Sequence, residues 1–163
     1  MGYALGILLI IYCLIFVYKT KTGSPSVMSQ TKAMKRVGKY VKPGMKVADL
    51  GAGDGSALIE MVKAGATTGE GWEIEPWVWL QAQRKIYAAR LQGQIKVNFG
   101  DMWRADLGKY ELLYVYQLTR YAPRLVKKIR QEMNRGSVVV ANTYPLKGLP
   151  LAKKDGELYI YRI

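Results

Sequence analysis

Residues 49–55 read Asp49-Leu50-Gly51-Ala52-Gly53-Asp54-Gly55, and this stretch decides the fold. It follows the apolar pair Val47-Ala48, and a helical pattern begins at Ser56. A strand, a loop with glycines at alternate positions and a helix together predict a loop that binds a nucleotide cofactor. Glycine lets the backbone turn sharply and lets a ligand approach the main chain without meeting a Cβ atom. The helix behind the loop offers amide groups that have no partner within the helix.

The spacing of the glycines indicates which cofactor the loop fits. A dinucleotide fingerprint is G-x-G-x-x-G, whereas this loop is D-x-G-x-G-x-G with an acid on each flank. Acidic flanks repel a pyrophosphate and favour a zwitterionic amino acid. The stretch resembles the first motif of Rossmann-like S-adenosylmethionine (SAM) methyltransferases. That resemblance implies SAM as the cofactor, bound by Asp49, Gly51, Ala52, Gly53, Asp54 and Gly55.

The rest of the chain alternates strands with helices. We expect strands at 46–50, 68–74, 95–99, 112–118, 137–142 and 158–163, and helices at 29–40, 56–63, 76–91 and 123–133. This alternation predicts right-handed crossovers and a mostly parallel sheet. The last strand lacks a crossover helix, so we expect it to return antiparallel beside 137–142. The prediction is an α/β, Rossmann-like methyltransferase sheet of six strands.

Two further strand ends carry residues that suit a cofactor, because ligands of doubly wound sheets sit at the carboxyl ends of the strands. Glu73 ends the second strand, where an acid accepts hydrogen bonds from both ribose hydroxyls; the alternative is a solvated acid before a helix. By resemblance to SAM enzymes, Asp101 takes the adenine amino group, and Met102 or Trp103 covers the adenine face. Core packing is an equal alternative for Trp103.

The start of the chain is uncharged from Met1 to Tyr18, which predicts a transmembrane anchor over residues 1–18. Residues 19–26 are interpreted as a basic linker and residues 27–163 as the methyltransferase domain. Eight basic residues and no acid lie between the anchor and Asp49. The positive-inside rule then predicts a single-pass membrane protein with a cytoplasmic catalytic domain. We expect the basic segment 19–46 to attract anionic lipid headgroups.

Composition excludes several kinds of chemistry. The chain has 25 basic and 12 acidic residues, a net charge of +13, and no histidine. Without histidine there is no His-dependent triad and no His metal site, and the lone Cys13 provides neither a disulfide framework nor a thiolate metal site. No metal is expected. Eight of the basic residues follow the apolar start, so the charge does not require a nucleic-acid partner, although it allows one.

A narrower resemblance is carried by Gly71-Trp72-Glu73-Ile74-Glu75-Pro76-Trp77 and by Gly100-Asp101-Met102-Trp103-Arg104-Ala105-Asp106-Leu107. Both runs resemble motifs of the membrane-anchored protein-lysine methyltransferases of the ATP synthase c-subunit and adenine nucleotide translocase type. The resemblance implies methylation of a lysine in a membrane or membrane-associated protein. Glu75 stands where that group has Asn, and it is our candidate for orienting or deprotonating the amine. The alternative for Glu75 is an acid that a helix dipole favours.

Two other functions stay open at this stage. The first is a membrane-tethered RNA or small-molecule methyltransferase. The second is a non-catalytic protein that binds SAM or serves as a lipid-attached scaffold. The fourth strand ends in Tyr116-Gln117-Leu118-Thr119 and lacks the N-P-P motif of base N6 methylation.

Overall fold

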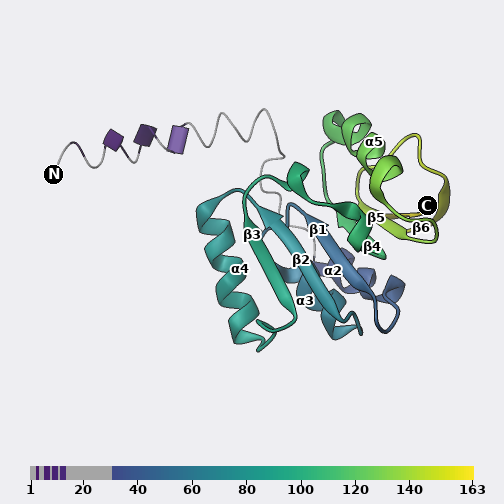
Figure 1. The fold of residues 1–163 in the computed structure, drawn as a ribbon, viewed down its shortest axis with the longest axis horizontal. Coiled ribbons are helices and arrows are strands. Elements are labelled where there is room, and N and C mark those ends of the chain that lie inside the picture. The colour runs from purple at the N-terminus through teal and green to yellow at the C-terminus, as the bar shows by residue number, and fades with distance from the viewer. Residues whose placement is uncertain (1–2, 4–5, 8, 11, 14–30) are drawn as a thin grey trace.

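A seven-stranded sheet with the order β3-β2-β1-β4-β5-β7-β6 forms the centre of the protein (Figure 1). The computed structural model describes residues 31–163 and residues 3, 6–7, 9–10 and 12–13. The strands are β1 (Lys46–Leu50), β2 (Thr68–Glu73), β3 (Ile95–Phe99), β4 (Leu112–Val115), β5 (Val138–Asn142), β6 (Leu151–Asp155) and β7 (Leu158–Arg162). The helices are α2 (Thr31–Val37), α3 (Ser56–Lys63), α4 (Pro76–Ala88) and α5 (Ala122–Glu132), with short 3-10 turns η1 (Gly38–Tyr40), η2 (Met102–Arg104), η3 (Leu107–Lys109) and η4 (Thr119–Tyr121).

The first five strands are parallel, and the last two return antiparallel. β1 pairs with both β2 and β4, and β4 pairs with β5, all in parallel. β7 runs antiparallel to β5, with Val140 opposite Ile160, and this confirms the predicted return of the last strand. The chain leaves β1 toward β2 on one side and resumes at β4 on the other. The carboxyl ends of β1 and β4 therefore form a topological switch point.

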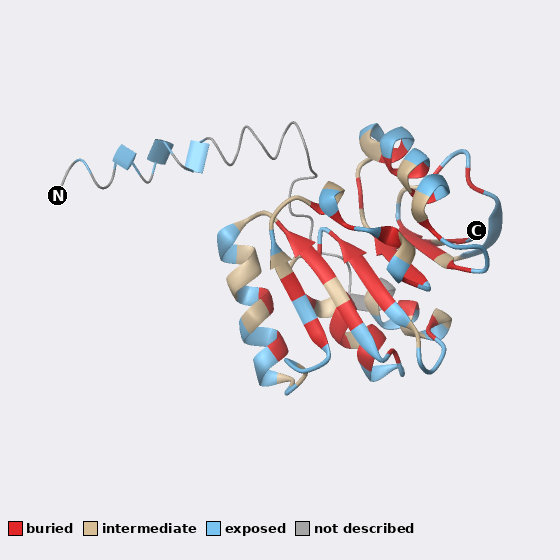
Figure 2. Ribbon diagram, viewed as in Figure 1, coloured by how far each residue is buried: buried red, intermediate tan, exposed pale blue. Residues whose placement is uncertain are grey.

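The two faces of the sheet bury separate apolar clusters. α2, α3 and α4 cover one face, where Leu58 and Ile86 pack with Val47 and Leu112. α5 covers the other face, where Leu125 packs with Leu113. Neighbouring residues of β4 enter opposite clusters because side chains alternate along a strand. All four residues of β4 are buried, as a strand covered on both faces should be (Figure 2).

The predicted count of six strands was wrong by one. β6, Leu151–Asp155, lies at the sheet edge and pairs only with β7 within the described chain. Its sequence is LAKKD, and its first four residues are exposed. Because an edge strand with no buried face needs no apolar alternation, the sequence pattern there reads as a loop.

Several element boundaries also differ from the prediction. α4 ends at Ala88 instead of Leu91, and β4 ends at Val115 instead of Leu118. Leu118 instead precedes the 3-10 turn η4. The predicted helix 29–40 is α2 followed by the 3-10 turn η1 from Gly38. Residues 29 and 30, where that helix was predicted to begin, lie outside the described residues.

The predicted transmembrane anchor is corrected by the structure. Among the residues that the structure describes, no helix is both long enough and apolar enough to cross a bilayer. A span needs about 20 consecutive apolar residues in one helix. The single-pass membrane location with a cytoplasmic catalytic domain therefore loses its structural basis. The predicted linker 19–26 lies outside the described residues.

Candidate functional site

The residues predicted to bind a cofactor gather at one edge of the sheet. They follow the carboxyl ends of β1, β2 and β3, which are neighbours in the strand order. Parallel strands bring these ends to the same edge, where doubly wound proteins bind their ligands. The sheet thus brings together residues that are more than 20 positions apart in sequence.

The loop after β1 depends on glycine for its backbone shape. Gly51, Gly53 and Gly55 have φ of 87°, 56° and 77°, in the left-handed region that side chains disfavour. The amides of Gly51 and Ala52 both donate to the carbonyl oxygen of Trp72, at 3.1 and 2.8 Å. A Cβ atom on Gly53 would meet nothing within 4 Å, so open space lies beside this part of the loop.

Glu73 joins the end of β2 to this loop. It is only 7% exposed, and its Oε2 accepts a hydrogen bond from the Gly53 amide at 3.1 Å. Its Oε1 accepts from the amides of Ile74 and Glu75 at 2.9 and 2.8 Å, directly before α4. Glu73 is therefore not the solvated acid of the alternative interpretation. Ribose hydroxyls that bound here would share the Glu73 carboxylate oxygens with backbone amides.

Asp49 is a buried acid beneath the loop. It is the fourth residue of β1 and 3% exposed. Burial raises its pKa well above the usual value, and the negative charges of Glu73 and Asp54 raise it further. Deprotonation of Asp49 is therefore less favourable than that of an exposed aspartate.

Both carboxylate oxygens of Asp54 accept hydrogen bonds from neighbouring groups of the protein. Its Oδ1 accepts from the Ser56 amide at 3.1 Å, and its Oδ2 accepts from Lys85 of α4. Although burial alone would raise its pKa, the hydrogen bonds from Lys85 and Ser56 hold the pKa of Asp54 below its usual value. The structure thus gives Asp54 a part in joining the loop to α4.

The residues after β3 form a short 3-10 turn. The Asp101 side chain caps it by accepting from the Trp103 amide at 3.0 Å. Met102 is buried, and its sulfur accepts a hydrogen bond from Gln117 at 3.1 Å. Trp103 packs under the guanidinium of Arg124, whose central carbon lies 4.0 Å from the ring centroid. That contact with α5 favours the packing interpretation of Trp103.

Glu75 occupies the N-cap position of α4. Its side chain makes no capping hydrogen bond, and Pro76 follows it at the first helical position. The residue is half-buried. An acid at this position interacts favourably with the helix dipole, whatever its role toward a substrate.

Gln117 belongs to this edge, although the sequence patterns did not single it out. It is 6% exposed, and its Nε2 donates to the Leu50 carbonyl oxygen at 3.0 Å. Because that carbonyl only accepts, the amide orientation is set, and Oε1 is left buried with no hydrogen-bond partner among the described residues. A polar residue two positions after the apolar run 112–115 was the signal that could have found it.

The family model of the ANTKMT methyltransferase domain matches residues 49–153, which is most of the chain. The chain belongs to this family. The match begins at Asp49 and includes the glycine loop, Glu73, the 3-10 turn after β3 and Gln117.

Individual relatives agree with this assignment. The mouse (Mus musculus) ATP synthase c-subunit lysine N-methyltransferase is 26% identical over 145 residues, covering 86% of this chain and 58% of the relative. The mouse adenine nucleotide translocase lysine N-methyltransferase is 27% identical over 105 residues, covering 64% of this chain and 45% of the relative. The chain spans about half the length of the curated relatives it matches. A crystal structure of an RNA methyltransferase from Salinibacter ruber with S-adenosyl-L-homocysteine has the same fold, with a TM-score of 0.75 at 20% identity, covering 83% of this chain and 92% of that one.

The residues present fit S-adenosylmethionine, the cofactor that a methyltransferase domain of this fold implies. The space beside Gly53 is open, so the loop backbone is accessible. The acids Asp49, Asp54 and Glu73 lie close enough to influence one another, which suits a ligand that carries positive charge. The Gln117 Oε1 atom adds a buried acceptor at the switch point between β1 and β4.

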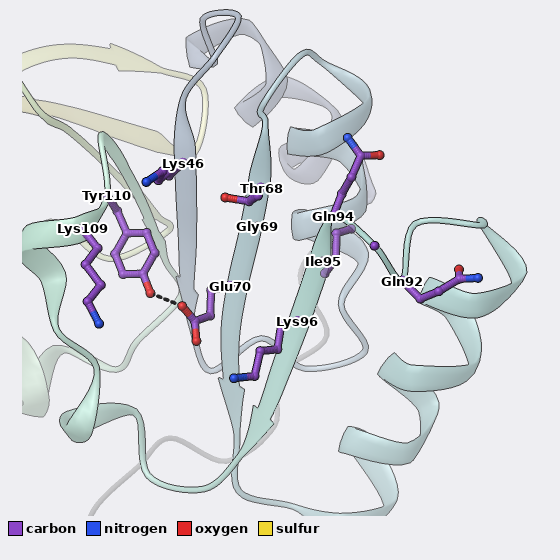
Figure 3. A pocket seen from close by; sticks show the side chains of 11 residues that line it. Lys46, Thr68, Gly69, Glu70, Gln92, Gln94, Ile95, Lys96, Lys109 and Tyr110 are labelled. Atoms are coloured by element: carbon purple, nitrogen blue, oxygen red, sulfur yellow. Dashed lines mark hydrogen bonds between the residues drawn. The ribbon is translucent and has the colours of Figure 1, made fainter.

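A separate hollow of about 480 Å³ opens at the opposite ends of the strands (Figure 3). It is lined by the first residues of β1, β2 and β3, namely Lys46, Thr68 and Ile95. Glu70 lies within it and accepts hydrogen bonds from the Tyr110 hydroxyl and from Asn98. Because it lies at the amino ends of the strands, this hollow is not the cofactor site.

Proposed function

We propose that this chain is a SAM-dependent methyltransferase that methylates a lysine side chain of a membrane or membrane-associated protein. The observation that carries the proposal is the glycine loop, which Glu73 ties to the end of β2 at 3.1 Å in a chain of the ANTKMT methyltransferase family. The proposed cofactor residues are Asp49, Gly51, Ala52, Gly53, Asp54, Gly55, Glu73, Asp101 and Met102. Trp103 is the weaker candidate because Arg124 already covers it.

The proposed reaction demands little acid–base machinery from the protein. When bound, the cofactor supplies a methyl group activated by a sulfonium. The lysine nitrogen must attack as the neutral amine, because an ammonium has no lone pair. The cofactor would supply the methyl group and keep the electrons of its carbon–sulfur bond, and the acceptor nitrogen would release a proton. The chain's own contribution is to position the two groups and exclude water, with Glu75 at the N-cap of α4 as the candidate acid beside the amine.

The choice of lysine as acceptor rests on the relatives. The mouse relatives are named as lysine N-methyltransferases of the ATP synthase c-subunit and of the adenine nucleotide translocase. The absence of histidine fits an acceptor whose proton is lost without a histidine base. An RNA or small-molecule acceptor is the competing outcome of the experiment.

The experiment combines labelled SAM, the whole protein and a membrane fraction, followed by hydrolysis of the labelled material to amino acids. We expect label in methyl-lysine. Label confined to nucleotides, lipids or another side chain would refute lysine as the acceptor. Absence of SAM binding by calorimetry would refute the proposal that the chain is a SAM-dependent methyltransferase.

Two glycine variants sharpen this test. Gly53→Ala adds a Cβ beside the loop, at φ 56° and in open space. Gly44→Ala adds one at φ 90°, also in open space but before β1 and away from the site. Both variants carry backbone strain of about 1–2 kcal/mol. We expect only Gly53→Ala to weaken SAM binding, and equal losses in both variants would show that strain alone is responsible.

We further propose that the basic segment 19–46 attracts anionic lipid headgroups, independently of any membrane-spanning helix. In its described part, Lys35, Arg36, Lys39, Lys42 and Lys46 are exposed. Each basic residue near a charged surface contributes about 1 kcal/mol. The test is sedimentation with vesicles that contain phosphatidylserine, with pure phosphatidylcholine vesicles as the control. We expect binding only to the anionic vesicles and loss of binding at high salt; equal sedimentation with both would contradict the proposal.

A further inference from the structure

Two strand ends at the site edge have no part in the proposed cofactor loops. β4 and β5 lie on the other side of the switch point from β2 and β3. Tyr116 directly follows β4, and Tyr144 lies two residues after β5. Gln117 donates to the Leu50 carbonyl at 3.0 Å, so the chain directly after Tyr116 is held against the end of β1. The two tyrosines therefore lie beside the end of β1, where the cofactor loop begins, and on the other side of it from β2.

The two rings form a stacked pair. Their centroids are 6.0 Å apart and their planes differ by 20°, whereas the pairs Trp72–Tyr110 and Trp79–Phe99 meet edge to face. Both tyrosines are half-buried. Each ring belongs to a different strand end, so the pair is an aromatic surface that two elements hold in place.

A strained turn brings Tyr144 to this position. The Tyr144 amide donates to the Asn142 carbonyl at 2.7 Å, and the residue between them, Thr143, has φ 64°. These features describe a γ-turn with positive φ, which is rare and strained, and a β-branched residue is an outlier there. Such backbone persists only where its surroundings enforce it, and it concentrates at functional sites.

The surroundings do enforce this turn. The Thr143 amide donates to the Glu157 carbonyl at 2.8 Å, and the Thr143 hydroxyl donates to Asn142 Oδ1 at 3.1 Å. Asn142 is buried, and its Nδ2 donates to the Tyr114 hydroxyl at 2.9 Å. The end of β5 is thus fixed by buried hydrogen bonds, and the turn places an aromatic ring at the site edge.

We propose that the Tyr116–Tyr144 pair is the binding wall for the side chain of the acceptor lysine. This inference rests on the proposed function, which it deepens by assigning the acceptor's subsite. Aromatic rings pack well against the methylene stem of a lysine and attract a cationic head through their π faces. A methylated ammonium keeps its charge but is less strongly hydrated, so the same wall suits a lysine that already carries methyl groups.

The experiment measures binding of a defined probe, without methyl transfer. The probe is the amide of Nα-acetyl-trimethyllysine, and its control is the neutral isostere in which carbon replaces the charged nitrogen. Both are titrated against the whole protein with S-adenosylhomocysteine present, by ligand-observed NMR. We expect the wild type to prefer the charged probe about 3- to 30-fold, the range of a cation–π contact. Equal affinity for both probes would overturn the proposal.

Variants test whether the Tyr116–Tyr144 pair binds the acceptor side chain or only supports the fold. We expect Tyr116→Ala and Tyr144→Ala to lose the preference for the charged probe, while Tyr144→Phe keeps it because the ring remains. Circular dichroism and calorimetric S-adenosylhomocysteine binding identify the variants that stay folded. A folded alanine variant that retains the preference would refute the wall. If the wild type fails to methylate lysine, the proposed function fails, and the titration still reports separately whether the rings recognise the cation.

Discussion

The amide nitrogen of Gly53 lies 3.1 Å from Glu73 Oε2 and donates a hydrogen bond to it, across two neighbouring parallel strands. A single buried carboxylate thereby sets the distance between the glycine loop and the start of α4, whose preceding amides it also binds. The loop conformation therefore depends on a residue 20 positions away. Binding and local stability are expected to change together when Glu73 is altered.

Replacing Glu73 with alanine should weaken SAM binding by about 1–3 kcal/mol, the usual scale for hydrogen bonds to a charged group. The loss has two sources, because the loop amide and the cofactor would both lose an acceptor. Calorimetry measures the affinity, and Glu60→Ala is the matched control because that acid of α3 is half-buried but is not a proposed site residue. Unchanged affinity in a folded Glu73→Ala protein would remove Glu73 from the site.

Replacing Asp49 with asparagine should stabilise the ligand-free protein at neutral pH. Burial, followed by the charges of Glu73 and Asp54, raises the native pKa of Asp49, so deprotonation is unfavourable in the folded state. The wild type is then most stable relative to the variant below the unfolded carboxyl pKa of about 4, and it loses stability as pH rises toward the raised native pKa. Each pKa unit of difference is worth about 1.4 kcal/mol.

Thermal unfolding of both proteins across this pH range checks the prediction. The Tm of Asp49→Asn should exceed that of the wild type at neutral pH, and the gap should narrow on acidification. A gap that is constant with pH would contradict the raised pKa.

The raised pKa of Tyr40 predicts that the protein loses stability at high pH. Burial, and then a 3.0 Å hydrogen bond to Asp155, raise its pKa to about 12. A tyrosine whose native pKa is raised stabilises the protein fully below its unfolded pKa of about 10. That contribution is lost as pH rises toward 12. Chemical denaturation should show a steeper loss in the wild type than in Tyr40→Phe. The variant itself should be about 1 kcal/mol less stable at neutral pH, and identical slopes would refute the assignment.

The Lys85–Asp54 pair should affect the pKa of Asp54 in the loop more than the free energy of unfolding. The Lys85 side chain is 50% exposed, so the pair is screened by solvent and contributes at most about 1 kcal/mol. Lys85→Met should raise the pKa of Asp54, because that pKa is held down against burial by the Lys85 and Ser56 hydrogen bonds. NMR titration of the Asp54 carboxyl carbon measures the change. Lys63→Met, a basic residue at the end of α3, is the control and should leave that pKa unchanged.

Much of the fold could be predicted from local patterns, and the failures have physical causes. β1 and α3 were predicted with their observed bounds. An apolar run and a glycine each influence the backbone conformation of only a few neighbouring residues, so their effect can be seen in the sequence. β6 could not be predicted, since Lys153 and Lys154 are exposed, and its backbone pairing with β7 and the contact of Lys154 with the Tyr159 ring need no apolar alternation. β4 ends at Val115, and the Gln117 side chain beyond it donates to the Leu50 carbonyl, a contact that only the assembled sheet creates.

In the site, too, some features could be predicted from local sequence patterns and others depend on packing. The glycines and Glu73 are visible in sequence because their spacing is itself the signal. The pairing of Asp54 with Lys85 and the contact of Arg124 with Trp103 depend on how α4 and α5 pack, and no spacing along the chain encodes them. The Tyr116–Tyr144 stack likewise exists only because β4 and β5 are neighbours.

The buried acid beneath the loop has a consequence for the thermodynamics of ligand uptake. Burial and the charges of Glu73 and Asp54 raise the pKa of Asp49 in the ligand-free protein. A positively charged ligand arriving beside it would lower its pKa, so that binding releases a proton to the buffer. The apparent enthalpy of SAM binding should then vary with the ionisation enthalpy of the buffer. S-adenosylhomocysteine, which lacks the sulfonium charge, should release fewer protons, so its affinity should rise less with pH than that of SAM. A charge-sensitive pocket of this kind would let the spent cofactor leave more readily than the fresh one.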